Sequence, residues 1–255
     1  MSNNDDTQYI KHFADQPKNY LRFRPTYPDQ LFNYLSNLTK VHDLAWDAGT
    51  GNGQVASVLA NYFQQVTATD ISQEQLDIAI KKKNIRYICC PSEDTNLTDH
   101  SIDLITVSQA LHWFDLDKFY REVKRVGKPD GVISAWCYTL GSINSTIDVI
   151  IQKLHRDILG DKYWPKERLY IEEEYKTIPF PFKQVKAPQF QVQKNFNFEE
   201  FIGYLNTWSA VKEYSKRNQH NPIALIYSEL KTAWGNPQDE NIMHWPLHLL
   251  VGYIT

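Results

Sequence analysis

Cysteine is scarce in this chain of 255 residues, which has three: Cys89, Cys90 and Cys137. Their spacing fits no metal-ligand pattern, and an odd number forms no complete disulfide framework. This usage is typical of a protein in the reducing cytoplasm, where we expect the chain to be located. Cys89 and Cys90 end an apolar run, so we interpret both as small buried side chains.

Long apolar runs and an excess of basic residues are also missing. No run approaches the roughly 18 residues that a membrane-spanning helix needs. The first residues contain neither a basic segment nor an apolar one, so we expect no signal peptide. A net charge of −3 argues against a broad basic surface for nucleic acid. We therefore predict neither a membrane nor a nucleic-acid partner, while the sequence leaves the oligomeric state undefined.

A metal site is not expected either. His244 and His248 have the spacing of a metal-binding pair on a helix. Pro246 lies between them, however, and their surroundings look like a strand. We therefore predict no bound metal.

The most informative feature that is present is the segment Asp47–Gly53, with the sequence D-A-G-T-G-N-G. It follows the apolar run Leu44–Trp46 and precedes a stretch with helical spacing. A strand that breaks into glycines and continues as a helix presents backbone N–H groups to a ligand. Asp70 ends the next apolar run, about 20 residues later, where a ribose-binding carboxylate is expected. The combination predicts a nucleoside cofactor.

The spacing of the glycines indicates which nucleoside. A dinucleotide site has the pattern G-x-G-x-x-G, whose third glycine would fall at Gln54, whereas here it falls at Gly53. No Gly-Lys-Ser/Thr follows, so a P-loop is excluded. A glycine-rich structural turn without a ligand remains an alternative, although the position of Asp70 disfavours it.

Strand-like and helix-like segments alternate from about residue 41 to 137. Ser72 and Gln75 form a capping box for one helix, which carries apolar residues as far as Ile80, and Asp115 or Asp117 caps a later one. Strands separated by helices imply right-handed crossovers and a parallel sheet that is covered on both faces. We therefore predict a doubly wound α/β fold with strands at 44–46, 66–69, 85–90, 102–107 and 132–136.

The remainder of the chain is less regular. Helical spacing extends over 145–160 and over Phe198–Tyr214. We predict a strand pair or sheet edge within Phe182–Val192 and a final strand over His244–Ile254.

At the glycine turn the residues resemble class I S-adenosylmethionine-dependent methyltransferases, whose first motif is an acid followed by G-x-G-x-G. Three further segments are similar to a small-molecule subfamily that includes trans-aconitate methyltransferase-like proteins. They are Tyr20–Pro28 (Y-L-R-F-R-P-T-Y-P), Ser108–Phe114 (S-Q-A-L-H-W-F) and Thr207–Ala210 (T-W-S-A).

The resemblance implies a Rossmann-like, mostly parallel sheet of seven strands, the last one antiparallel, with helical cap insertions. It divides the chain into an N-terminal lid segment (1–39), an S-adenosylmethionine-binding α/β core (40–140) and a C-terminal part that completes the sheet and adds cap helices (141–255).

The resemblance also implies roles for individual residues. Asp47 would orient the methionine amino group of the cofactor, Asp70 would bind both ribose hydroxyls, and Ile71 would pack on the adenine. The backbone carbonyl of Gln109 would face the methionine ammonium. Where many relatives have an aspartate the chain has Pro91, so adenine would bind either to backbone N–H groups or to a carboxylate of the following residues. The implied cofactor-binding residues are Tyr20, Arg24, Asp47, Gly49, Gly51, Gly53, Asp70, Ile71, Ser92, Glu93, Asp94 and Gln109.

Other residues of the similar segments have two interpretations each. His112 is a candidate general base because its ordinary pKa lies near neutrality, or it shapes the pocket and binds substrate. We interpret Trp113 as part of the core rather than as a ring facing the sulfonium. Tyr20 and Arg24 either close over the cofactor or pack on the surface. Tyr204, Trp208 and Tyr214 either cover the acceptor pocket or form an ordinary hydrophobic helix face.

The predicted function is methyl transfer from S-adenosylmethionine to a small molecule, at an organic acid or a hydroxyl oxygen. One alternative is a protein that binds S-adenosylmethionine or S-adenosylhomocysteine without catalysis. A nicotinamide oxidoreductase is a further alternative, but it requires the glycine that is missing at Gln54.

Overall fold

The computed structural model describes residues 23–255, which form two compact units. The sheet unit comprises Tyr27–Thr139, Leu169–Val192 and Pro246–Thr255. The helical unit comprises Leu140–Arg168 and Gln193–Trp245, together with the described residues before Tyr27. The division into residues 1–39, 40–140 and 141–255 stays a prediction.

One mixed sheet of eight strands has the order β3-β2-β1-β4-β5-β8-β6, and β7 also pairs with β8. Strands β1 to β5 are parallel, and β8 runs antiparallel to β5 and β6. The mostly parallel α/β sheet and its antiparallel final strand are therefore confirmed. The strands are β1 (Leu44–Ala48), β2 (Gln65–Asp70), β3 (Ile85–Cys89), β4 (Ile102–Ser108), β5 (Gly127–Tyr138), β6 (Lys183–Gln184), β7 (Phe190–Phe196) and β8 (Asn241–Tyr253).

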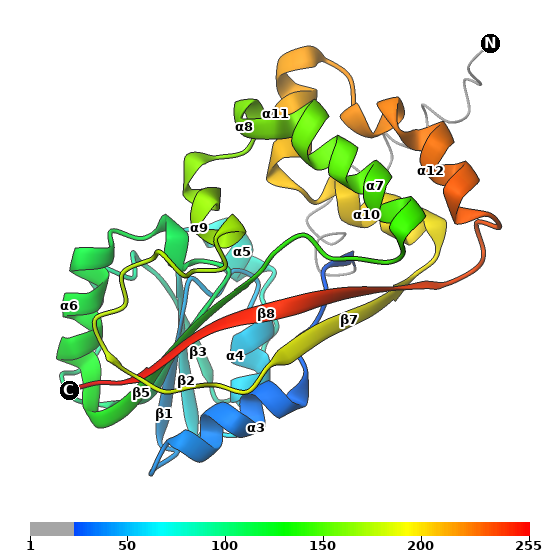
Figure 1. Ribbon diagram of the computed structural model, residues 1–255. Coiled ribbons are helices and arrows are strands. Elements are labelled where there is room, and N and C mark those ends of the chain that lie inside the picture. Colours follow the sequence, from blue (N-terminus) through cyan, green and yellow to red (C-terminus); the bar gives the residue numbers. More distant parts are fainter. Residues whose placement is uncertain (1–22) are drawn as a thin grey trace. The chain divides into compact units, whose positions relative to one another are not determined.

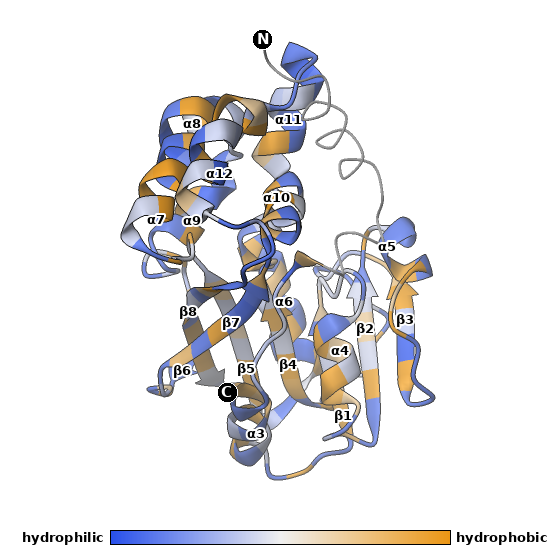
Figure 2. Cartoon of the chain, turned by 90° about the vertical axis from the view of Figure 1, so that its right-hand side faces the viewer, coloured by the Kyte–Doolittle hydropathy of each residue, from blue (hydrophilic) through white to orange (hydrophobic). Residues whose placement is uncertain are grey.

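Helices cover both faces of the sheet, as Figure 1 shows, with α6 on one face and α3 and α4 on the other. Strand β4 is mostly apolar, with Asp103 as its charged residue, whereas α5 is polar over most of its surface (Figure 2). Central parallel strands buried on both faces require this pattern. The helices and helical turns of this unit are α3 (Asp29–Leu38), α4 (Gln54–Leu59), α5 (Gln73–Asp77), the 3₁₀ turn Leu111–Trp113, α6 (Leu116–Val126) and α9 (Leu169–Glu172).

Two helix starts match the sequence prediction. The Ser72 side chain accepts a hydrogen bond from Gln75 N at 3.3 Å, and Asp115, not Asp117, caps α6 through Lys118 N at 3.2 Å. The prediction that the helix after Ser72 extends to Ile80 is wrong, because Ile80 N donates instead to Asn52 O at 3.0 Å. A tertiary hydrogen bond thus ends α5 early.

The helical unit is built around aromatic side chains. Phe201 stacks on Trp234 with ring centroids 5.2 Å apart, and Trp245 donates its indole N–H to the Tyr204 hydroxyl at 3.2 Å. The helix predicted over Phe198–Tyr214 is interrupted between Asn206 and Ser209.

The helical elements of this unit are α7 (Ser145–Gln152), a π-helical segment (Lys153–Leu159), α8 (Gly160–Tyr163), a 3₁₀ turn (Lys166–Arg168), α10 (Phe198–Asn206), α11 (Ser209–Asn218), a 3₁₀ turn (Pro222–Leu225) and α12 (Tyr227–Trp234).

The interpretation of Cys89 and Cys90 as buried side chains is wrong. Cys89 is exposed and Cys90 is partly exposed, because β3 is an edge strand of the sheet. Cys137, on the interior strand β5, is buried. Within residues 23–255, no helix has both the length and the apolar character that crossing a membrane requires.

Candidate active site

The turn after β1 depends on glycine at three positions. Gly49, Gly51 and Gly53 have φ values of 68°, 55° and 79°, a left-handed conformation that side chains disfavour. A Cβ atom on Gly49 would lie 2.6 Å from the Ala110 Cβ, and one on Gly53 would lie 2.1 Å from the Tyr87 hydroxyl oxygen. A Cβ on Gly51 would have the Gln75 side-chain oxygen as its nearest neighbour, at 3.9 Å. Among the residues that the structure describes, the side of the turn at Gly51 is therefore open.

Asp70, at the end of β2, holds this turn in place. Its Oδ2 accepts from Gly51 N at 2.8 Å, and its Oδ1 accepts from Ser72 N at 2.9 Å. Each carboxylate oxygen has room for a second hydrogen bond, so the group still suits a pair of neighbouring hydroxyls.

The backbone donors of the turn are largely used within the protein. Thr50 N donates to Thr69 O at 2.9 Å, and Gly53 N donates to Thr50 O at 3.0 Å. With Gly51 N bound to Asp70, the expectation that the turn presents its N–H groups to a ligand is wrong for these three amides. This arrangement disfavours a phosphate ligand, which such turns bind through several free N–H groups.

Asp47, near the end of β1, is almost completely buried, with 1% of its surface exposed. It accepts hydrogen bonds from the Thr50 hydroxyl at 2.6 Å, the Thr106 hydroxyl at 2.8 Å and Ala56 N at 3.1 Å. Burial raises the pKa of Asp47 to about 6, although these hydrogen bonds oppose the rise. A carboxylate accepts about four hydrogen bonds, so about one position remains for a cation or a water molecule.

The residues expected near adenine lie at the ends of β2 and β3. Ile71 is 77% exposed, which leaves a large apolar side chain open to a planar ligand. Ser92 is buried, with its hydroxyl 3.3 Å from that of Thr69, and Glu93 accepts from Asp115 N at 3.0 Å. Asp94 is exposed.

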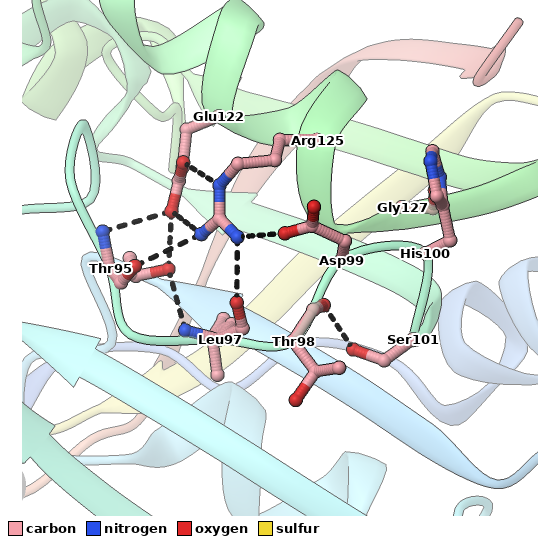
Figure 3. Close-up of polar contacts among 9 residues, drawn as sticks. All are labelled: Thr95, Leu97, Thr98, Asp99, His100, Ser101, Glu122, Arg125 and Gly127. Atoms are coloured by element: carbon pink, nitrogen blue, oxygen red, sulfur yellow. Dashed lines mark hydrogen bonds and ion pairs between the residues drawn. The ribbon is translucent and has the colours of Figure 1, made fainter.

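An ion pair between buried Glu122 and partly exposed Arg125, which the sequence analysis missed, anchors the loop after β3 (Figure 3). Glu122 on α6 accepts from Thr95 N at 2.9 Å and from two guanidinium nitrogens of Arg125. Arg125 also donates to the carbonyls of Thr95 and Leu97 and to Asp99. Burial alone would raise the pKa of Glu122, but the hydrogen bonds from Arg125 and Thr95 outweigh it and lower the pKa. Spacing at i, i+3 on a helix was the available sequence signal.

The segment after β4 contains the remaining candidates in this unit. Gln109 has a φ of 54°, unusual for a residue with a side chain, and its N–H donates to Trp136 O at 2.9 Å. His112 is 7% exposed, and its Nδ1 lies 2.9 Å from the hydroxyl of Tyr175. The interpretation of Trp113 as core is wrong, because this side chain is 55% exposed.

Comparison with known proteins agrees with this geometry. A family model described as "Methyltransferase domain" matches residues 46–135, which include the glycine turn and Asp70. A methyltransferase of Dictyostelium discoideum is 33% identical over 251 residues, which cover 96% of this chain and 95% of that protein. CRG1 of Saccharomyces cerevisiae, named as a probable S-adenosylmethionine-dependent methyltransferase, is 31% identical. The match covers 88% of this chain and 90% of that protein. The chain belongs to the S-adenosylmethionine-dependent methyltransferases.

A solved structure supports the fold of this methyltransferase over nearly its whole length. The protein from Anaeromyxobacter dehalogenans, described as a type II methyltransferase, is 37% identical and has a TM-score of 0.84. The similarity covers 91% of this chain and 98% of that one.

The cofactor of the methyltransferase is S-adenosylmethionine, and the site in the sheet unit fits it. The open side at Gly51, the remaining acceptor positions on Asp70 and the exposed Ile71 all occur at the carboxyl ends of β1 and β2. In a doubly wound sheet this is where ligands bind.

Several candidates belong to other parts of the methyltransferase. Tyr20 lies outside the described residues. Arg24 is in the helical unit, where its Nη2 donates to Thr207 O at 3.2 Å and its guanidinium lies 5.8 Å from the centre of the Tyr204 ring. Tyr204 and Trp208 are buried there, whereas the Tyr214 ring lies 4.8 Å from that of Tyr163. His244 and His248 are both on β8, which is a strand and not a helix.

Proposed function

We propose that this methyltransferase acts on a small organic acid and belongs to the subfamily that includes trans-aconitate methyltransferase-like proteins. The observation that carries the cofactor site is the bond from Gly51 N to Asp70 Oδ2, which fixes the turn and leaves acceptor positions on the same carboxylate. The H-W-F segment after β4, whose His112 is buried, supports the subfamily assignment.

S-adenosylmethionine supplies an activated methyl group on a positively charged sulfur. The chain's own task is to hold the acceptor in line with that methyl, and such positioning contributes several kcal/mol, with about 7–11 available from ideal orientation. We propose that Asp70 binds the ribose hydroxyls, that Ile71 packs on the adenine and that Asp47 orients the methionine amino group through its remaining acceptor position.

The other assignments follow from position in the chain. We propose that the Gln109 carbonyl accepts from the methionine ammonium and that Ser92, Glu93 and Asp94 contact the adenine. Gly49, Gly51 and Gly53 form the turn beneath the cofactor, while Tyr20 and Arg24 close over it. His112 contacts the acceptor.

A panel of carboxylic acids and alcohols, each supplied with radiolabelled methyl donor, tests the proposal. The expected result is label transfer to at least one carboxylic acid, with S-adenosylhomocysteine formed in equal amount. Tight binding of S-adenosylmethionine without turnover over the whole panel would instead support the non-catalytic alternative. Thermal stabilisation by NAD but not by S-adenosylmethionine would overturn both. The cytoplasmic location and the lack of a nucleic-acid partner stay predictions.

A further inference from the structure

Tyr87, on the edge strand β3, reaches across its neighbouring strand to the glycine turn. Asp47 pairs with Ala68 in the register of β1 and β2, and Ala68 pairs with Tyr87 in that of β2 and β3. Paired residues of neighbouring strands project to the same face of a sheet. Ala68 is fully buried and has the smallest side chain of the three. It leaves room for the Tyr87 ring, whose hydroxyl oxygen reaches Gly53.

This contact requires glycine at position 53. The Tyr87 hydroxyl oxygen occupies the place where a Cβ atom on residue 53 would lie. Gly53 is the N-cap residue of α4, and it offers no side chain to accept a hydrogen bond from the first turn. Asp47 supplies that acceptor instead, since its Oδ2 accepts from Ala56 N at 3.1 Å. The third glycine of the motif therefore depends on a tyrosine of another strand.

The Tyr87 hydroxyl also fixes the peptide groups of Ile80. It donates to Ile80 O at 2.6 Å, while Ile80 N donates to Asn52 O at 3.0 Å. Burial, with a smaller contribution from Asp47, raises the pKa of Tyr87 to about 12, so the phenol keeps the proton that it donates. Tyr87 thus contacts the turn directly at Gly53 and, through Ile80, at Asn52.

The segment between α5 and β3 has a second attachment to Tyr87. Lys81 Nζ donates to Leu76 O on α5 at 2.8 Å and lies 4.7 Å from the centre of the Tyr87 ring. An ammonium group over an aromatic face is attracted by the ring. Both the ring and the hydroxyl of Tyr87 therefore bind the segment that carries Ile80.

We propose that Tyr87 is a positioning residue for S-adenosylmethionine, which acts by fixing the Asn52–Gly53 end of the glycine turn. The role rests on the proposed function, which places the cofactor at this turn. Asp70, on β2, holds the same turn at Gly51. The turn is thus fixed from two strands before the cofactor binds, and such preorganisation increases affinity because less conformational freedom is lost on binding.

Tyr87→Phe tests this role, because it keeps the ring and removes the hydroxyl. The dissociation constant of S-adenosylmethionine, measured by isothermal titration calorimetry without any acceptor, should rise about threefold to tenfold, the effect of one lost hydrogen bond. Tyr120→Phe is the matched control, since Tyr120 also donates its hydroxyl to a backbone carbonyl of the sheet unit, that of Pro179. It should lower stability but leave the dissociation constant within about twofold.

Hydrogen exchange of the cofactor-free protein tests the geometry separately. The Ile80 amide should exchange faster in Tyr87→Phe than in the wild type, because its bond to Asn52 O loses the support of the hydroxyl. In Tyr120→Phe its rate should be unchanged. An unchanged rate in Tyr87→Phe would show that the hydroxyl does not fix the turn.

Failure of the positioning role is distinguishable from failure of the proposed function. Normal cofactor affinity in folded Tyr87→Phe, with weakened binding in Gly51→Ala, would refute the role of Tyr87 alone. Normal affinity in both variants would place the cofactor elsewhere. Failure of the carboxylic acid panel would overturn only the proposed acceptor class, because neither measurement contains an acceptor.

Discussion

The Oδ2 atom of Asp70 lies 2.8 Å from the backbone nitrogen of Gly51. Asp70, at the end of β2, thus holds Gly51, the middle glycine of the turn after the neighbouring strand β1. One residue therefore has two roles in our interpretation, since it shapes the turn and binds the ribose. Substitutions of Asp70 should change cofactor affinity through both.

Asp70→Asn should lower the affinity for S-adenosylmethionine about 10-fold to 100-fold, because an amide replaces one charged acceptor by a donor. Asp77→Asn is the control, since Asp77 is an exposed carboxylate on α5. It should leave the dissociation constant within about twofold, as surface substitutions generally have small effects. Isothermal titration calorimetry measures both constants, and equal affinities for the two variants would show that Asp70 does not bind the cofactor.

Gly51→Ala should weaken cofactor binding more than it weakens the fold. The new Cβ projects towards the open side of the turn, so its cost to stability is the backbone conformation, about 1 kcal/mol. Gly235→Ala is the control at a distance in the chain, because Gly235 also has a positive φ, 84°, and its Cβ would meet no atom of residues 23–255 within 4 Å. Denaturant unfolding should show a loss of stability in both variants, while thermal stabilisation by S-adenosylmethionine should fall only in Gly51→Ala. Normal stabilisation of Gly51→Ala would place the cofactor elsewhere.

Asp47→Asn should stabilise the protein at high pH. Burial raises the pKa of Asp47 from 3.8 to about 6, so the folded state holds this proton more tightly than the unfolded state does. The contribution of Asp47 to stability therefore falls as the pH rises from about 4 to about 6, by about 3 kcal/mol. The free energy of unfolding of Asp47→Asn should exceed that of the wild type at about pH 8, and the two should converge near pH 4.

Asp103→Asn provides the contrast for that measurement. Asp103 is also buried, but it pairs with Lys128 at 2.7 Å, so removing its charge should destabilise the protein at about pH 8. If both variants lose stability there, the hydrogen bonds of Asp47 matter more than the cost of burying its charge.

Glu122→Gln should increase the mobility of the loop after β3, which contains residues Ser92–Asp94. It leaves Arg125 without its buried charge partner, and we expect a loss of about 1–3 kcal/mol in the free energy of unfolding. The affinity for S-adenosylmethionine should fall as well if this loop contacts the adenine. Asp99→Asn removes only the exposed partner of Arg125 and should change neither quantity by much. Unchanged affinity in destabilised Glu122→Gln would mean that adenine binds without this loop.

The sequence alone determined the alternation of strands and helices from about residue 41 to 137 and the turn between β1 and α4. Alternating apolar runs, capping residues and glycines that need positive φ are local signals, and each was readable without knowing its neighbours in space. The motif Asp47–Gly53 and the distal Asp70 indicated the cofactor for the same reason. The end of α5, the break after Asn206 and the exposure of Cys89 were not predictable in this way, because a distant hydrogen-bond partner or the edge of the sheet decides each of them.

The tertiary structure decided what the polar groups of the site contact. Asp47 and Asp70 are both acids at strand ends in the sequence. The fold buries Asp47 among three hydrogen-bond donors of the protein, whereas each carboxylate oxygen of Asp70 accepts one hydrogen bond and can accept another. His112 and Tyr175 are 63 residues apart in the chain and 2.9 Å apart in space. Whether a histidine donates or accepts depends on its hydrogen-bond partner, and here folding alone brings that partner into reach.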